Sequence, residues 1–182
     1  MIQITTLVRL ILPLIFVFLL WLAPTSTPVL FGCLGLLLAL EMVNILDSRL
    51  SGSWEQSSRL WAMMDPFSES WSRILIFWAM ASADLALPLV PLVLALSDVT
   101  MAYARITLTR CGKVVSTRLS ERIKVVTQAC GAVALLLGPL YWQHVGRDPG
   151  AVVSWLVMVV TAASVVRVAA VAIRTALEAR SR

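Results

Sequence analysis

Long runs of apolar residues, separated by short polar stretches, dominate the chain. Two of these runs, residues 125–146 and 149–166, contain no Asp, Glu, Lys or Arg. Residues 24–40 are also uncharged, and residues 7–23 contain only Arg9. Because a membrane-crossing helix needs about 20 mostly apolar residues, the pattern predicts an all-α integral membrane protein.

The same pattern predicts six transmembrane helices that form a single membrane domain over residues 1–182. The predicted helices cover residues 7–23, 28–47, 63–83, 86–109, 122–142 and 150–174. The first segment could instead be a signal peptide, because Arg9 precedes an apolar stretch that ends at Ala23. Its long apolar body favours a retained span.

Composition and charge support the membrane assignment and predict an orientation. Hydrophobic residues make up 59% of the chain and charged residues 14%, against about a quarter charged in soluble domains, which excludes a water-soluble monomer. With six helices, every Lys and Arg except Arg147 falls on the side of the two termini. The positive-inside rule therefore predicts cytoplasmic termini in an inner, cytoplasmic membrane. The net charge of +5 needs no nucleic-acid partner, because no nucleic-acid-binding module accompanies it.

Polar residues interrupt the second and third predicted helices. Asn44 and Asp47 are three positions apart, and Asp65 and Glu69 are four apart, so each pair shares a helix face. Glu41 extends the first face by one turn. Two adjacent helices would then point these oxygen-bearing side chains into one cytoplasm-facing cleft, where hard oxygen ligands favour magnesium, manganese or calcium. The alternative is that they cap helix ends at the membrane surface.

The sequence around these carboxylates resembles the signature D-x2-D-G-x2-A-R-x8-G-x3-D-x3-D of the CDP-alcohol phosphatidyltransferase family, in register and without a gap. The signature positions fall, in order, on Asn44, Asp47, Ser48, Ser51, Gly52, Trp61, Asp65 and Glu69. Segments similar to the phosphatidylglycerophosphate synthase branch are residues 7–14, Gln56 to Pro66, Ala104-Arg105, and Lys124 with Thr127-Gln128. The resemblance covers most of the chain.

The resemblance implies a six-helix enzyme that transfers a phosphatidyl group from CDP-diacylglycerol to a small phosphorylated alcohol, such as glycerol phosphate, and releases CMP. It implies that Glu69 activates the acceptor hydroxyl, and that Mg²⁺ or Mn²⁺ binds at Asn44, Asp47, Asp65 and Glu69, with Glu41 as a compensating ligand. Nucleotide binding would fall to Ser48, Ser51, Gly52 and Trp61. The acceptor phosphate would contact Arg105, Arg110, Arg118 and Lys124. A homodimer is also implied.

Three departures from the signature argue for lost or altered activity. Asn44 offers a carbonyl oxygen but no negative charge, which weakens metal binding. Gly52 stands in place of the signature's Arg. Trp61 stands in place of Gly, where its indole could occlude the pocket, anchor at the membrane surface or stack on a ligand. The alternative function is therefore a catalytically inactive family member, a lipid-binding or structural subunit of a membrane complex.

The fourth predicted helix carries a further acidic and basic pair. Asp98 precedes Arg105 by seven residues, about two helical turns. Asp98 would therefore either pair with Arg105 or line the same polar cavity. The basic residues in this region have an alternative role in setting topology and contacting anionic lipid headgroups.

Overall fold

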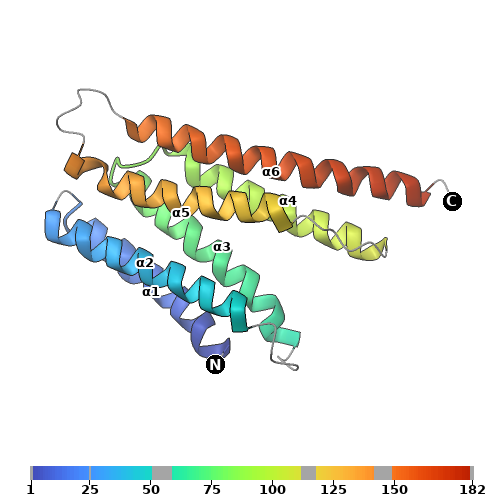
Figure 1. The fold of residues 1–182 in the computed structure, drawn as a ribbon, viewed down its shortest axis with the longest axis horizontal. Coiled ribbons are helices and arrows are strands. Elements are labelled where there is room, and N and C mark those ends of the chain that lie inside the picture. Colours follow the sequence, from blue (N-terminus) through green and yellow to red (C-terminus); the bar gives the residue numbers. More distant parts are fainter. Residues whose placement is uncertain (1, 25, 51–58, 112–117, 142–148, 181–182) are drawn as a thin grey trace.

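The computed structural model is a bundle of six helices in which consecutive helices run in opposite directions (Figure 1). The helices are α1 (Ile2–Leu22), α2 (Thr27–Leu50), α3 (Arg59–Ser82), α4 (Leu89–Arg110), α5 (Arg118–Tyr141) and α6 (Pro149–Arg180). The structure describes residues 2–24, 26–50, 59–111, 118–141 and 149–180. The predicted all-α architecture is confirmed, and each helix overlaps one predicted segment.

Several helix ends differ from the sequence-based boundaries by a few residues. α4 begins at Leu89 rather than residue 86 because a tight turn precedes it, in which Asp84 has a φ of 57°. The backbone N–H groups of Leu85 and Ala86 both donate to the carbonyl of Met80 there. α6 continues to Arg180 rather than ending at residue 174, and Thr175 in the added part is buried.

The apolar side chains form one main core and one small core. All six helices contribute to the main core, including Phe16, Leu30, Met80, Leu94 and Leu135. The small core lies only between α4 and α6 and consists of Met101, Ala104, Leu108, Val168 and Ala172. In Figure 1, α4 and α6 both extend beyond α3 and α5 toward the C-terminus.

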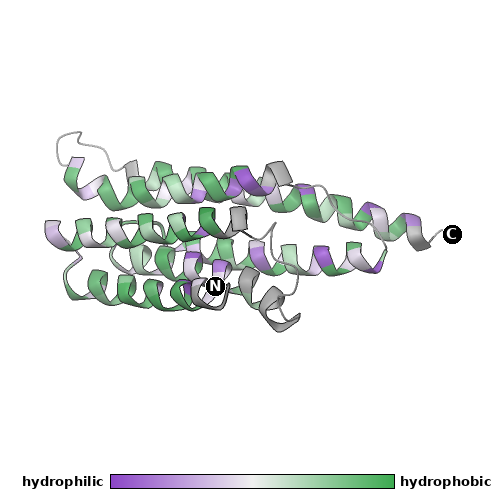
Figure 2. Cartoon of the chain, turned by 60° about the horizontal axis from the view of Figure 1, so that its bottom comes forward, coloured by the Kyte–Doolittle hydropathy of each residue, from purple (hydrophilic) through white to green (hydrophobic). Residues whose placement is uncertain are grey.

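Five of the six helices are long and apolar enough to cross a membrane, namely α1, α2, α4, α5 and α6. In the described part of the chain α3 is not among them, because Ser68, Glu69, Ser70, Ser72 and Arg73 lie near its middle. Figure 2 shows apolar residues over the half of the bundle that holds the α1–α2 and α3–α4 turns, while hydrophilic residues gather toward the other half. The chain is a multi-pass integral membrane protein.

The choice of neighbouring helices determines which residues the polar stretch of α3 can contact. α3 packs against α1, α4 and α5, whereas α2 packs against α1 and α5. α3 can therefore direct ionisable side chains toward the other polar positions on α4 and α5. The candidate site therefore lies where α3 meets α4 and α5.

Candidate active site

The site starts from the polar face of α3. Ser68, Ser72 and Arg73 are buried, while the Glu69 side chain is 41% exposed. Arg73 Nη2 donates to Glu69 Oε1 at 2.9 Å. The four-residue spacing makes this contact possible, because it puts the two side chains one above the other on a helix. Burial of the guanidinium requires further hydrogen-bond partners.

A second partner of the guanidinium comes from α5, and that partner is itself held by α6. Arg73 Nη1 donates to Gln128 Oε1 at 2.7 Å, and Gln128 Nε2 donates to Thr161 Oγ1 at 3.0 Å. Gln128 and Thr161 are both almost completely buried. A continuous hydrogen-bonded line thus runs from the Glu69 carboxylate on α3 through α5 to α6.

A second ion pair joins α4 to α5 next to this line. Lys124 Nζ donates to Asp98 Oδ1 at 2.7 Å and to Ser97 Oγ at 3.3 Å. The Lys124 side chain is 11% exposed and that of Asp98 22%. The ammonium group is therefore largely removed from solvent but has both a charged and a neutral acceptor.

A third ion pair joins the same helices at a more exposed level. Arg105 Nη2 donates to Glu121 Oε1 at 2.9 Å, and the two side chains are 55% and 30% exposed. The guanidinium therefore remains accessible to a ligand.

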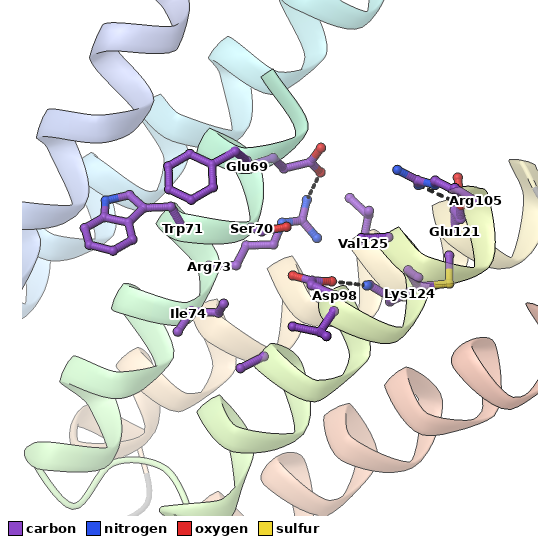
Figure 3. A pocket seen from close by; sticks show the side chains of 15 residues that line it. Glu69, Ser70, Trp71, Arg73, Ile74, Asp98, Arg105, Glu121, Lys124 and Val125 are labelled. Carbon is purple, nitrogen blue, oxygen red and sulfur yellow. Dashed lines mark hydrogen bonds and ion pairs between the residues drawn. The ribbon is translucent and has the colours of Figure 1, made fainter. Parts of the chain in front are cut away.

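One cavity of about 520 Å³ brings the three ion pairs together between α3, α4 and α5 (Figure 3). Its ionisable lining residues are Glu69, Arg73, Asp98, Arg105, Glu121 and Lys124. In Figure 3, the Glu69–Arg73 and Asp98–Lys124 pairs lie close together, and the Arg105–Glu121 pair lies farther along α4 and α5. The described walls thus carry equal numbers of acidic and basic groups, each base paired with an acid.

The structure brings together only part of the predicted site. Glu69, Arg105 and Lys124 line the cavity, whereas Arg110 lies exposed near the end of α4 and is not a lining residue. Ser51 and Gly52 lie outside the described residues, and for five other predicted residues, which lie in helices, only the backbone is described: Asp47, Ser48, Trp61, Asp65 and Arg118.

The predicted metal ligands of α2 are only partly described. Asn44 Nδ2 donates to Glu41 Oε2 at 3.4 Å, so these two side chains contact each other. No described residue of α2 lines the cavity. The described part of the chain holds a cavity between α3, α4 and α5. The expected cleft between the second and third helices stays a prediction, because the side chains of Asp47 and Asp65 are not described.

The pairing proposed for Asp98 is corrected in one respect. Asp98 was expected either to pair with Arg105 or to line the same cavity. It lines the cavity, and it pairs with Lys124 rather than with Arg105. Arg105 instead contacts Glu121 from α5. Asp98 and Lys124 can pair because they lie on neighbouring helices and meet at the cavity. Asp98 and Arg105 lie two turns apart on one helix, which separates them by about 10 Å along its axis.

Sequence reasoning missed Arg73, Glu121 and Thr161 as members of the site. The four-residue spacing of Glu69 and Arg73 was a usable signal, since oppositely charged residues at this spacing pair on a helix. Glu121 and Thr161 carried no local signal, because their contacts depend on how α5 meets α4 and α6.

These features define a class: a multi-pass membrane protein with an ionisable cavity among its helices. The sequence profile described as CDP-alcohol phosphatidyltransferase matches residues 3–171. The chain belongs to this family, whose membership points to phospholipid metabolism and a lipid substrate. No curated protein and no solved structure matches the chain.

The family generally uses divalent metal ions. Asn44, Glu41 and Glu69 offer the hard oxygen atoms that Mg²⁺ prefers, and Glu69 Oε2 is not the atom held by Arg73. Among the described side chains, no three His, Cys, Asp or Glu residues come together to hold a metal ion. The donor chemistry fits the group, with Asp47 and Asp65 as its remaining predicted ligands.

Proposed function

We propose that the protein transfers a phosphatidyl group from CDP-diacylglycerol to a small phosphorylated alcohol, such as glycerol phosphate, with release of CMP. The observation that carries this proposal is the placement of Glu69, Arg105 and Lys124 around one cavity. A carboxylate can accept a proton from an alcohol, and guanidinium and ammonium groups bind phosphate. Glycerol phosphate follows from the similarity to the phosphatidylglycerophosphate synthase branch.

The proposed transfer is a substitution at phosphorus. The acceptor's hydroxyl oxygen forms a bond to the phosphorus of the phosphatidyl group, and the bond from that phosphorus to the CMP oxygen breaks. The hydroxyl proton passes to the Glu69 carboxylate, and the electron pair of the broken bond leaves with CMP. Arg105 and Lys124 hold the acceptor's phosphate and so orient its hydroxyl.

The proposed metal site uses Asp47, Asp65, Glu69 and Asn44, with Glu41 as a further ligand. When bound there, Mg²⁺ or Mn²⁺ would neutralise charge on the donor's pyrophosphate. Nucleotide contacts are assigned to Ser48, Ser51, Gly52 and Trp61, and further acceptor contacts to Arg110 and Arg118. These assignments rest on the family resemblance.

We also propose a single membrane domain over residues 1–182 with six spans, α3 included, and with cytoplasmic termini in an inner membrane. α3 needs no apolar surface all round, because Arg73 in its central polar stretch hydrogen-bonds to Gln128 on α5. The concentration of Lys and Arg on the side of the termini supports the orientation. A homodimer is proposed from the family resemblance.

The function is tested by CMP release from proteoliposomes that contain the full chain, CDP-diacylglycerol, glycerol phosphate and Mg²⁺ or Mn²⁺. Glu69→Gln should lower the rate by about 100-fold or more, because it removes a general base. Glu178→Gln, an exposed carboxylate on α6, is the matched control and should keep the wild-type rate. No CMP release by the wild-type protein with either metal would overturn the proposal.

A second function is favoured by one observation. The three basic cavity groups are each paired with a carboxylate, and Asn44 contributes an amide where the signature has an acid. Such a site suits an inactive lipid-binding or structural subunit of a membrane complex. Binding of CDP-diacylglycerol without turnover, unaffected by metal ions and by Asp65→Ala, would support this function.

A further inference from the structure

We infer that Arg73 is a positioning residue that holds the Glu69 carboxylate in place for proton transfer, and that Gln128 and Thr161 hold Arg73. This inference rests on the proposed function. The signature's final Asp falls on Glu69, whose side chain is longer by one methylene and gains one rotatable bond. A longer carboxylate needs an additional restraint if its oxygen is to stay within reach of one hydroxyl.

The contacts supply that restraint from three helices. The guanidinium is a planar fork, and in this fork Nη2 binds Glu69 Oε1 while Nη1 binds Gln128 Oε1. The Gln128 amide is held in turn by Thr161. Glu69 and Arg73 line the cavity, whereas the buried Gln128 and Thr161 lie behind them and are not lining residues.

The ion pair of Arg73 differs from those of the other two basic residues in the cavity. Arg105 and Lys124 pair with carboxylates from a neighbouring helix, so their ion pairs join helices. Arg73 pairs within its own helix, and its second hydrogen bond carries the attachment to α5. The two hydrogen bonds of Arg73 therefore hold the Glu69 side chain in a fixed position relative to α5.

The test compares the effect of each variant on kcat in two proteins, the native chain with Glu69 and the Glu69→Asp variant, in the proteoliposome assay. In the native background, Arg73→Met should lower kcat by about 10- to 100-fold, because misplacement by about 1 Å has effects of this size. The KM for CDP-diacylglycerol should change less than about twofold. The shorter Asp cannot reach Arg73 in the same way, so Arg73→Met should change kcat by less than about threefold in that background.

Three further variants guard against simple misfolding. Thr161→Val nearly preserves shape and removes only the last acceptor, so it should lower kcat by about two- to fivefold with Glu69 and have no effect with Glu69→Asp. Arg73→Lys supplies a charge without the planar fork and should rescue only part of the loss. Lys124→Met breaks a neighbouring ion pair and should act by the same factor in both backgrounds.

The possible failures are distinguishable. Equal fold-losses for Arg73→Met with Glu69 and with Glu69→Asp would overturn the positioning role while leaving the transferase function intact. Absence of CMP release from both Arg73-containing proteins, with every acceptor supplied, would overturn the proposed function and the positioning role together.

Discussion

Two ion pairs join α4 to α5, yet they differ in exposure. Lys124–Asp98 is largely buried and includes Ser97 as a second acceptor, whereas Arg105–Glu121 is more exposed. Removing one member of a buried pair leaves a charge without compensation, while an exposed charge is solvated by water. The buried pair should therefore matter for the stability of the bundle, and the exposed pair is better suited to ligand binding.

The largest effect is expected when the buried pair is broken. Lys124→Met leaves the Asp98 carboxylate without its cation and should lower the free energy of unfolding by about 3 kcal/mol. Thermal unfolding in detergent would measure the change. The double variant Lys124→Met/Asp98→Leu should recover most of the loss, since an apolar pair needs no charge compensation. A double variant as unstable as the single one would contradict this account.

An intermediate effect is expected where α5 meets α6 without charges. A methyl group at Gly131 would collide with the side chain of Val157. Gly131→Ala should therefore destabilise the bundle by about 1–3 kcal/mol through overpacking. Val157→Ala added to this variant should restore stability by making room. The same unfolding measurement applies, and a Gly131→Ala protein as stable as the wild type would show that the two helices can move apart freely.

The smallest stability effect is expected at the exposed pair. Arg105→Met should change the free energy of unfolding by about 1 kcal/mol or less, and the difference should shrink as salt is added. The same variant should raise the KM for glycerol phosphate about tenfold, because a charged hydrogen bond is worth about 1.5 kcal/mol or more. A large loss of stability with an unchanged KM would reverse the roles assigned to the two pairs.

The fold was predictable to a greater extent than the site. Apolar runs of membrane-crossing length are a local property, so residues 125–146 and 149–166 indicated α5 and α6 directly. The turn at Asp84 was harder to place, because a single residue of positive φ leaves little trace in hydrophobicity. α3 was predicted as a transmembrane helix, but it is not among the described helices that are apolar enough to cross a membrane. Its buried Arg73 instead depends on Gln128 from α5, a contact that the local sequence does not specify.

Within the site, local spacing identified individual groups but not their partners. Glu69, Arg105 and Lys124 were singled out from the sequence and line the cavity. Lys124 nevertheless pairs with Asp98, a residue 26 positions away on another helix. Such a partner depends on the packing of whole helices, which neither periodicity nor a signature motif specifies.

The hydrogen bond from Arg73 to Gln128 also has a consequence for how the protein is made. Gln128 follows Arg73 by 55 positions, so it leaves the ribosome well after α3 has been synthesised. Until α5 emerges, the Arg73 guanidinium lacks this acceptor, and exposing it to hydrocarbon is unfavourable. In the proposed six-span arrangement, α3 would therefore not settle in lipid as an isolated segment. Its insertion would be completed only when α5 arrives, so biogenesis of such a bundle would depend on cooperation between non-consecutive segments.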